Sequence, residues 1–304
     1  MSADTNQSNR NWIIVLIILL LVLPLCCLGT LCASFTLGIG AMDSSGDLGN
    51  LNIIDDLSSL ADFNRASVTK TVEREFDVHT GHVTLTVDIE VGSVSIETGG
   101  DREVIVEADL TAYGEDEDAA NEAMDNLDLR FTPTDNEIAI SSHWPKPDNW
   151  SHSTPKVELR LTVPDDTAVD IKLDVGDVDV KDTESDLDIQ VSVGDVDVRD
   201  VRLEDAMVID VSTGSIKYRG DLTEGTRYQL TTSIGQVVME IPDDSSFDID
   251  ATADVGEVQT DFEIVGEEDV DFVGNTLQGT VGDAGTGTEL ILSTDIGVVK
   301  VKYN

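Results

Sequence analysis

The sequence predicts an all-β fold: a β-solenoid of repeats of about 20 residues, with one short inserted helix and an N-terminal transmembrane helix. Three observations predict it. Apolar and polar residues alternate along most of the chain after Val68, which is typical of strands with one buried face. A unit with a central glycine recurs at nearly constant spacing. One long segment near the N-terminus is apolar and uncharged.

Residues 12–40 are the predicted transmembrane helix, which makes the lipid bilayer an expected partner. The segment holds no charged residue, and about 20 apolar residues suffice to cross a bilayer. A cleaved signal peptide is the alternative, but its apolar region is usually about 7–15 residues. Arg10 precedes the segment and the next basic residue is Arg65, so the positive-inside rule places residues 1–11 in the cytoplasm. We therefore expect a single-pass protein of the cell membrane with an extracellular C-terminal domain.

Residues 41–66 are predicted to link this helix to an extracellular β-repeat domain, residues 67–304. The linker begins with loop composition and continues with apolar residues at helical spacing, which predicts a short amphipathic helix. That helix either docks on the domain or lies on the membrane surface. The absence of basic residues from residues 53–61 favours docking.

The first part of the β-repeat domain is predicted to form half-buried strands. Val, Ile, Leu and Ala alternate with polar residues over 83–91, 104–110 and 157–163. Residues 115–127 break this pattern, because their Ala, Met and Leu share one helical face and acidic residues precede them. We expect one short helix laid over the sheet.

The strongest signal is a unit of alternating apolar residues interrupted by a glycine. The apolar pattern changes phase there: residues from Ile171 to Val175 share one parity, whereas Val178 and Val180 share the other. A straight strand cannot bury both sets, since a slip of one residue moves side chains to the opposite face. The chain must therefore turn at each glycine, which accepts the positive φ of a corner. The predicted structural turns are Gly92, Gly176, Gly194, Gly214, Gly235, Gly256 and Gly297.

Two geometries satisfy this change of phase. In a β-solenoid, each glycine is a corner between two walls and equivalent strands of successive coils pair in parallel. In an antiparallel β-sandwich or meander, each glycine belongs to a two-residue hairpin turn. Both bury the same Val, Ile and Leu residues. The near-constant spacing favours the solenoid, because similar units stack on one another.

The charge of the chain is strongly acidic. The 304 residues include 61 Asp and Glu against 18 Lys and Arg, a formal net charge of −43, which excludes nucleic acid as a main partner. Outward positions of the repeats are rich in Asp, and carboxylates are the ligands that calcium prefers. Neither the β-roll calcium repeat nor an EF-hand loop occurs, so a solvated acidic face is the favoured interpretation. The residues with the weakly calcium-binding pattern are Asp177, Asp179, Asp195 and Asp197.

The repeat resembles a known family. The units LDVGDVDV (173–180) and VSVGDVDV (191–198), and the closing stretch at 277–301, are similar to the putative adhesin family, a bacterial and archaeal domain of β-strand repeats. The resemblance covers residues 68–304. It implies a surface-exposed, solenoid-like domain that often follows a single N-terminal anchor, and it brings no catalytic residues. Some relatives are associated with envelope-stress responses.

No catalytic motif is present, so we expect neither an enzyme nor a cofactor. One loop, residues 143–155, concentrates Trp, His and Pro. Trp144 and Trp150 are its candidate ligand contacts, because Trp supplies apolar area and a hydrogen-bond donor at binding sites. Alternatively, both rings cover the open end of the β-core.

These observations predict a non-enzymatic, membrane-anchored cell-surface protein. Its acidic ectodomain would serve as an adhesin-like or envelope scaffold module. One alternative is a sensory or envelope-stress ectodomain that binds cationic peptides, which the net charge would attract. Another is a domain that binds or cleaves polysaccharide. The expected partners are accordingly a surface polymer, a cationic peptide or a protein.

Overall fold

A computed structural model describes residues 66–78, 82–99, 102–145, 155–270, 274–283, 285 and 287–304. These residues contain fifteen strands and one helix. The predicted transmembrane helix (12–40) and linker helix (within 41–66) lie outside them. No helix in the described part is long and apolar enough to span a membrane.

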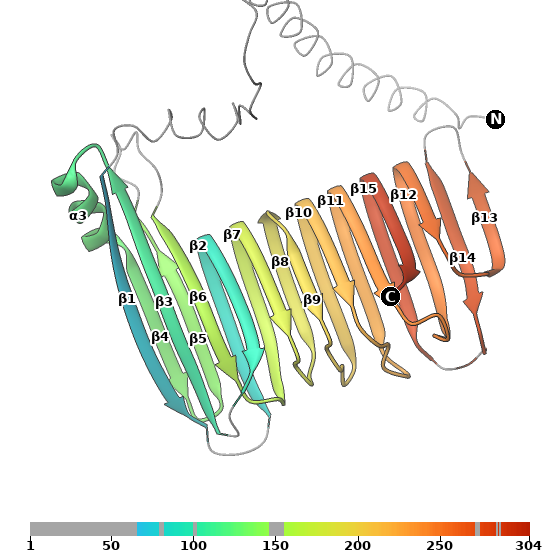
Figure 1. The fold of residues 1–304 in the computed structure, drawn as a ribbon, viewed down its shortest axis with the longest axis horizontal. Helices are drawn as coiled ribbons and strands as arrows, with labels where there is room; N and C mark the ends of the chain where they lie inside the picture. The colour runs from blue at the N-terminus through green and yellow to red at the C-terminus, as the bar shows by residue number, and fades with distance from the viewer. Residues whose placement is uncertain are drawn as a thin grey trace, which may run out of the picture. The chain divides into compact units, whose positions relative to one another are not determined.

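Figure 1 shows the strands side by side, from β1 at one end to β13 at the other. In its regular part, each strand buries every second side chain, as the alternation of apolar and polar residues predicts. In chain order the elements are β1 (Ala66–Asp77), β2 (Val83–Thr98), β3 (Glu103–Gly114), α3 (Glu117–Asn126), β4 (Asp128–Thr134), β5 (Glu137–His143), β6 (Lys156–Val163), β7 (Thr167–Lys181), β8 (Leu187–Val193), β9 (Val196–Arg199), β10 (Ala206–Arg219), β11 (Arg227–Ile241), β12 (Phe247–Thr260), β13 (Val265–Val270), β14 (Asn275–Val281) and β15 (Glu289–Tyr303).

Glycine corners divide the sheet into two walls. Around Gly194 the two walls carry separate strands: β8 pairs with the segments of β7 and β10 that precede their glycines, and β9 pairs with the segments that follow. We call the segments before the glycines, with β4, β5, β13 and β14, wall 1. The segments after the glycines, with β1, β3 and β6, are wall 2. Inward side chains of both walls form one core.

The predicted fold class is wrong as stated, although the described chain is all-β with one helix. A solenoid stacks its repeats in chain order, whereas β15 lies between β11 and β12, and β6 lies between β3 and β2. The outermost strands pair antiparallel, as β1 with β3 and β13 with β14. The alternative sandwich or meander is also wrong, because the central strands pair in parallel.

The equivalence of the repeats explains why sequence order does not set spatial order. Gly297 of β15 aligns with Gly235 on one side and Gly256 on the other, so both neighbours present the same local pattern. A strand of this type can pair with any other strand of its kind. The segments 265–270 and 275–281 hold no glycine corner, and they close the end of wall 1 as an antiparallel hairpin.

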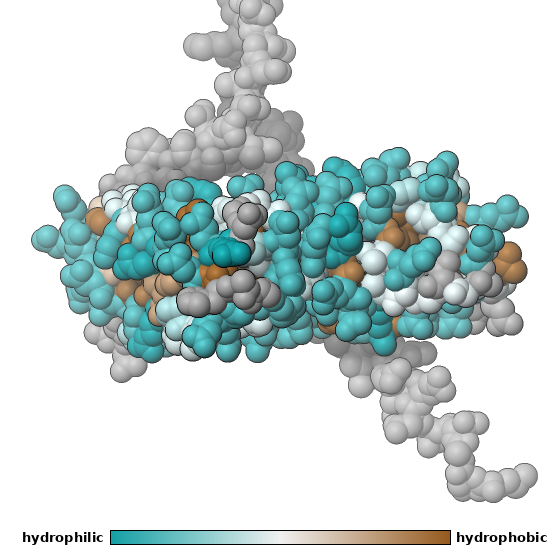
Figure 2. Space-filling view, turned by 90° about the horizontal axis from the view of Figure 1, so that it is seen from below, coloured by the Kyte–Doolittle hydropathy of each residue, from teal (hydrophilic) through white to brown (hydrophobic). Residues whose placement is uncertain are grey.

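The core is aliphatic, with aromatic pairs at intervals. The rings of Tyr218 and Tyr228 meet edge to face, with centroids 5.4 Å apart, and both side chains are fully buried. The Tyr218 hydroxyl donates to the Asp221 carbonyl (2.6 Å), and burial raises the pKa of that tyrosine. Helix α3 packs Ala120 and Ala123 against this sheet near β3. Seen from below, the surface is mostly hydrophilic, with small hydrophobic patches among the polar residues (Figure 2).

Candidate functional site

The seven predicted turn glycines form a continuous column. Their φ angles lie between 141° and 156°, a backbone region that residues other than glycine rarely adopt. A Cβ atom on Gly176 would lie 1.6 Å from the carbonyl oxygen of Gly92, and one on Gly194 would lie 1.7 Å from that of Gly176. Each glycine therefore makes room for the backbone of the next strand. The same contacts continue through Gly214, Gly235, Gly297 and Gly256.

A ridge of apolar side chains runs along the outside of this column. The apolar residue before four of the seven glycines faces solvent: Val175 is 45% exposed, Val193 48%, Ile234 51% and Ile296 50%. Val91 and Val255, at the equivalent positions, are half-buried. The expectation that Val175 is buried with Ile171 is therefore wrong. The inner side of the corner is filled by the stacked glycines, so the preceding side chain lies on the outer side.

The outer face of wall 1 is strongly acidic. We compare the positions two, four and six residues before each glycine, which point outward because the strands alternate. Only one of these positions is basic, Lys172, whereas nine are acidic. The nine are Asp88, Glu90, Asp170, Asp174, Asp188, Asp210, Asp250, Asp254 and Asp295.

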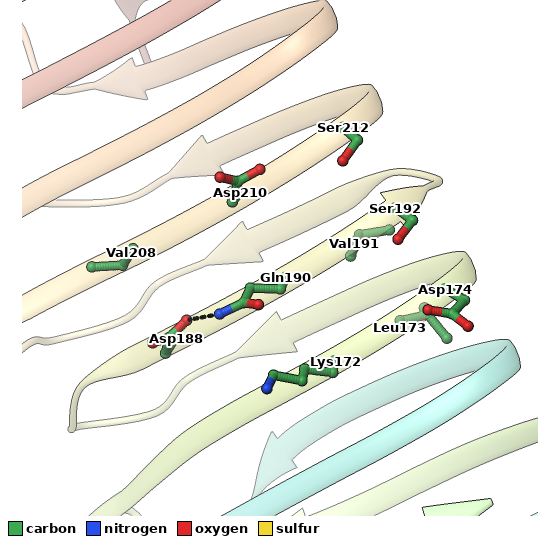
Figure 3. A pocket seen from close by; sticks show the side chains of 10 residues that line it. All are labelled: Lys172, Leu173, Asp174, Asp188, Gln190, Val191, Ser192, Val208, Asp210 and Ser212. Carbon is green, nitrogen blue, oxygen red and sulfur yellow. Dashed lines mark hydrogen bonds between the residues drawn. The ribbon is translucent and has the colours of Figure 1, made fainter. Parts of the chain in front are cut away.

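A shallow polar groove of about 480 Å³ lies on this face, across β7, β8 and β10 (Figure 3). Asp174, Asp188 and Asp210 line it from three successive strands, beside Lys172 and Val208. The Gln190 amide donates a hydrogen bond to Asp188 (3.4 Å). We call this feature the acidic groove. Its carboxylates are exposed and suited to a cationic ligand rather than to a buried metal ion.

The four predicted calcium ligands are engaged with the protein itself. The Asp177 carboxylate accepts a hydrogen bond from the backbone N–H of Asp195 (3.0 Å), and the Asp195 carboxylate accepts one from Ser215 (2.8 Å). Each of the two therefore caps the corner of the next strand. Asp179 and Asp197 both pair with Arg199. Among the described residues, no group of three or more His, Cys, Asp or Glu is arranged to hold a metal ion.

The corresponding outward positions of wall 2 carry more bases than those of wall 1. The positions one, three and five residues after each glycine hold six bases, against eight acids. The acids are Glu97, Asp177, Asp179, Asp195, Asp197, Glu240, Glu257 and Asp261. The bases are Lys181, Arg199, Lys217, Arg219, Lys300 and Lys302.

Glu240 contacts three of these bases. Its carboxylate is 11% exposed and lies 2.6 Å from Arg219 Nε, 2.9 Å from Lys302 Nζ and 3.4 Å from Lys217 Nζ. Burial alone would raise the pKa of Glu240, but hydrogen bonds from Lys302, Arg219 and Lys217 outweigh it and lower the pKa to about 2. Lys217 and Lys300 flank Val238 on β11. We call Lys217, Arg219, Lys300 and Lys302 the cationic cluster, a feature that single-sequence periodicity did not reveal.

The structure describes only one of the two candidate tryptophans. Trp144 is 3% exposed, so its ring does not present a face for stacking in this conformation, and Trp150 lies outside the described residues. The Glu90 carboxylate accepts a hydrogen bond from the Trp144 backbone N–H (3.4 Å) and lies 3.1 Å from His143 Nδ1. These contacts hold the end of β5 against β2.

Comparison with known proteins is limited to distant structures. No family model and no curated protein matches the chain. A structure described as a putative cell adhesion protein from Clostridium sporogenes is 16% identical, with a TM-score of 0.45, over 77% of this chain and 100% of that one. Putative adhesins from Bacteroides fragilis (15% identity, TM-score 0.41) and Parabacteroides distasonis (13%, 0.26) each match over 77% of this chain and 97% of their own. At these scores the similarity carries no argument about function.

Proposed function

We propose that this chain is a non-enzymatic, membrane-anchored cell-surface protein whose β-repeat domain is an adhesin-like or envelope scaffold module. In this proposal residues 12–40 hold the protein in the membrane, with the N-terminus in the cytoplasm and the domain outside. The binding surfaces are the two outer faces of the domain.

The observation that carries the proposal is the alignment of outward side chains in rows. The strand registers place equivalent positions opposite one another, as Gly92 with Gly176 and Asp179 with Asp197. Neighbouring strands lie about 4.8 Å apart, so each row is a regular series of side chains across the sheet. Such surfaces suit extended or macromolecular partners, which contact several strands at once.

Adhesion by cells that display the full chain tests this function. We expect these cells to adhere to one another or to a coated surface more than cells displaying Gly194→Val, which disrupts the domain. Reaction of an introduced Ser212→Cys with a membrane-impermeant maleimide reports whether the domain is outside. Equal adhesion by both displayed chains, with the domain outside, would reject the proposal.

The acidic face of wall 1 favours a second candidate function, a sensory ectodomain for cationic peptides. Nine carboxylates against one lysine attract such peptides, and salt weakens the attraction. A lysine-rich peptide should bind the full chain in detergent at low salt, and binding should fall in the triple variant Asp174→Asn, Asp188→Asn, Asp210→Asn. Undiminished binding at 1 M salt, where the Debye length is about 3 Å, would argue against this candidate.

A further inference from the structure

We infer that the domain recognises a second copy of itself, with the cationic cluster of one molecule seated on the acidic groove of the other. This inference rests on the proposed function and names the partner of the adhesin-like module. The two surfaces lie on opposite walls, so one molecule can use both at once. Contacts between unlike surfaces extend from copy to copy rather than closing as a symmetric dimer.

The cationic cluster has the composition of a binding surface. Four of the 18 bases of a strongly acidic chain gather on β10 and β15. The single carboxylate between them, Glu240, is mostly buried, whereas Lys217, Arg219 and Lys302 remain partly exposed. The surface therefore presents the cations and hides the carboxylate that lies between them.

The cluster is also held in place before any partner arrives. Three of its side chains contact one buried carboxylate, which restricts their rotamers. Because less side-chain entropy remains to be lost, binding to a partner costs less than it would for free lysines. Glu240 is thus a positioning residue for the surface.

The acidic groove has the complementary chemistry. Asp174, Asp188 and Asp210 are exposed, and no ion pair joins any of them to another residue that the structure describes. Val208 adds apolar surface to the groove, and Val238 lies between the two columns of cations in the cluster. The acidic groove and the cationic cluster therefore carry opposite charges, and each includes an apolar side chain.

The spacing of the charges is similar on the two surfaces. Lys217 and Lys300 are two strands apart, across β11, as are Arg219 and Lys302. Asp174 on β7 and Asp210 on β10 are also two strands apart, across β8, but they are offset by two residues, since Asp210 aligns with Gln190 and Lys172. Two strand spacings amount to about 10 Å in the cluster and, with this offset, to about 12 Å in the groove, a difference that long lysine side chains can span. Two cations of one copy can therefore meet two carboxylates of the other.

The interaction is expected to be weak between single molecules. Each copy carries a formal charge of −43, and this repulsion opposes approach until salt screens it. Contact pairs at short range are screened less than the net charge. On a cell surface, many copies act together and raise the effective concentration.

A charge-swap experiment on the full chain in nanodiscs, one copy per disc, tests the inference by sedimentation at 0.15 M salt. Lys217→Glu with Lys300→Glu reverses the cluster, and Asp174→Lys with Asp210→Lys reverses the groove. We expect wild-type discs to associate and each double variant alone to associate at least about tenfold more weakly. A one-to-one mixture of the two variants should recover association, because the reversed cluster then meets the reversed groove.

Lys70→Glu with Arg102→Glu is the matched control, since it changes the net charge as the cluster variant does but lies elsewhere. It should associate like the wild type. Failure of the mixture to recover association, or monomeric wild-type discs, would overturn the inference. If displayed cells still adhere to other surfaces in that case, the proposed function stands and only its partner is wrong.

Discussion

Wall 1 and wall 2 are joined by strands that cross the glycine corners, and they share one core, yet their outer faces differ in charge. Three outward positions before each glycine hold nine acids and one base, and three positions after it hold eight acids and six bases. The inward residues are alike on both sides, mostly Val, Ile and Leu. Folding therefore depends on the inward pattern and the corners, whereas the outward positions are free to specialise.

The largest loss of stability is expected at a corner glycine, where the two walls join. Gly194→Val places a side chain against the Gly176 carbonyl and forces a residue with a Cβ to φ of 151°. We expect a loss of about 3 kcal/mol or more in unfolding free energy, which thermal unfolding of the full chain would detect. Gly225→Val is the control, since φ there is 76° but no atom lies within 4 Å of an added Cβ. Equal losses at the two sites would contradict the stacking argument.

A second test separates inside from outside within one strand of wall 1. Val191 is 2% exposed and Val193 is 48% exposed, two residues apart on β8. Val191→Ala should lower the unfolding free energy by about 2 kcal/mol because it leaves a cavity in the core. Val193→Ala should change it by less than about 0.5 kcal/mol. A large loss at Val193 would mean that the ridge is covered.

A third test addresses the buried carboxylate of wall 2. The pKa of Glu240 is about 2, below the ordinary value of 4.5, so the folded state binds this proton less readily than the unfolded state. Its stabilisation is complete above pH 4.5 and is lost as the pH falls toward 2. Glu240→Gln should cost about 2 kcal/mol at pH 7, and the difference from the wild type should shrink below pH 4.5. A difference that stays constant from pH 7 to pH 2 would exclude this origin.

The smallest effect concerns like charges on wall 1. Asp170 and Asp188 are directly opposite each other on β7 and β8. Asp188→Asn should raise the unfolding free energy by a few tenths of a kcal/mol at low salt, and 1 M salt should abolish the gain. On wall 2, Lys217→Gln should have the opposite sign, because Lys217 lies opposite Asp197 and contacts Glu240. Two changes of the same sign would remove the contrast between the walls.

Much of the local structure could be predicted from periodicity. The alternation of Val, Ile and Leu identified strands such as 157–163, and the acidic start of 115–127 preceded a helix that Asp116 caps through Ala119 N. The exposure of Val175 could not be predicted in this way. Alternation along the sequence predicts which side chains are buried only while the strand is straight. At the corner the backbone bends, and the side chain just before the glycine turns outward.

The candidate surfaces were less accessible from sequence. The four cations of the cluster lie as far apart as Lys217 and Lys302 in the chain. Only strand pairing brings them together, three of them in contact with Glu240. The aspartates at 177, 179, 195 and 197 looked like metal ligands by composition. Their contacts show two of them capping corners and two pairing with Arg199, which sequence spacing does not reveal.

By itself, the amino-acid sequence determined which residues turn, which alternate and that the chain is acidic, because these depend on single residues and their nearest neighbours along the chain. Tertiary structure alone decided that β15 lies between β11 and β12 and that the charges separate onto two faces. Strand pairing is a choice among units of nearly equal local pattern. Such a choice is made by long-range packing, which no local window of residues contains.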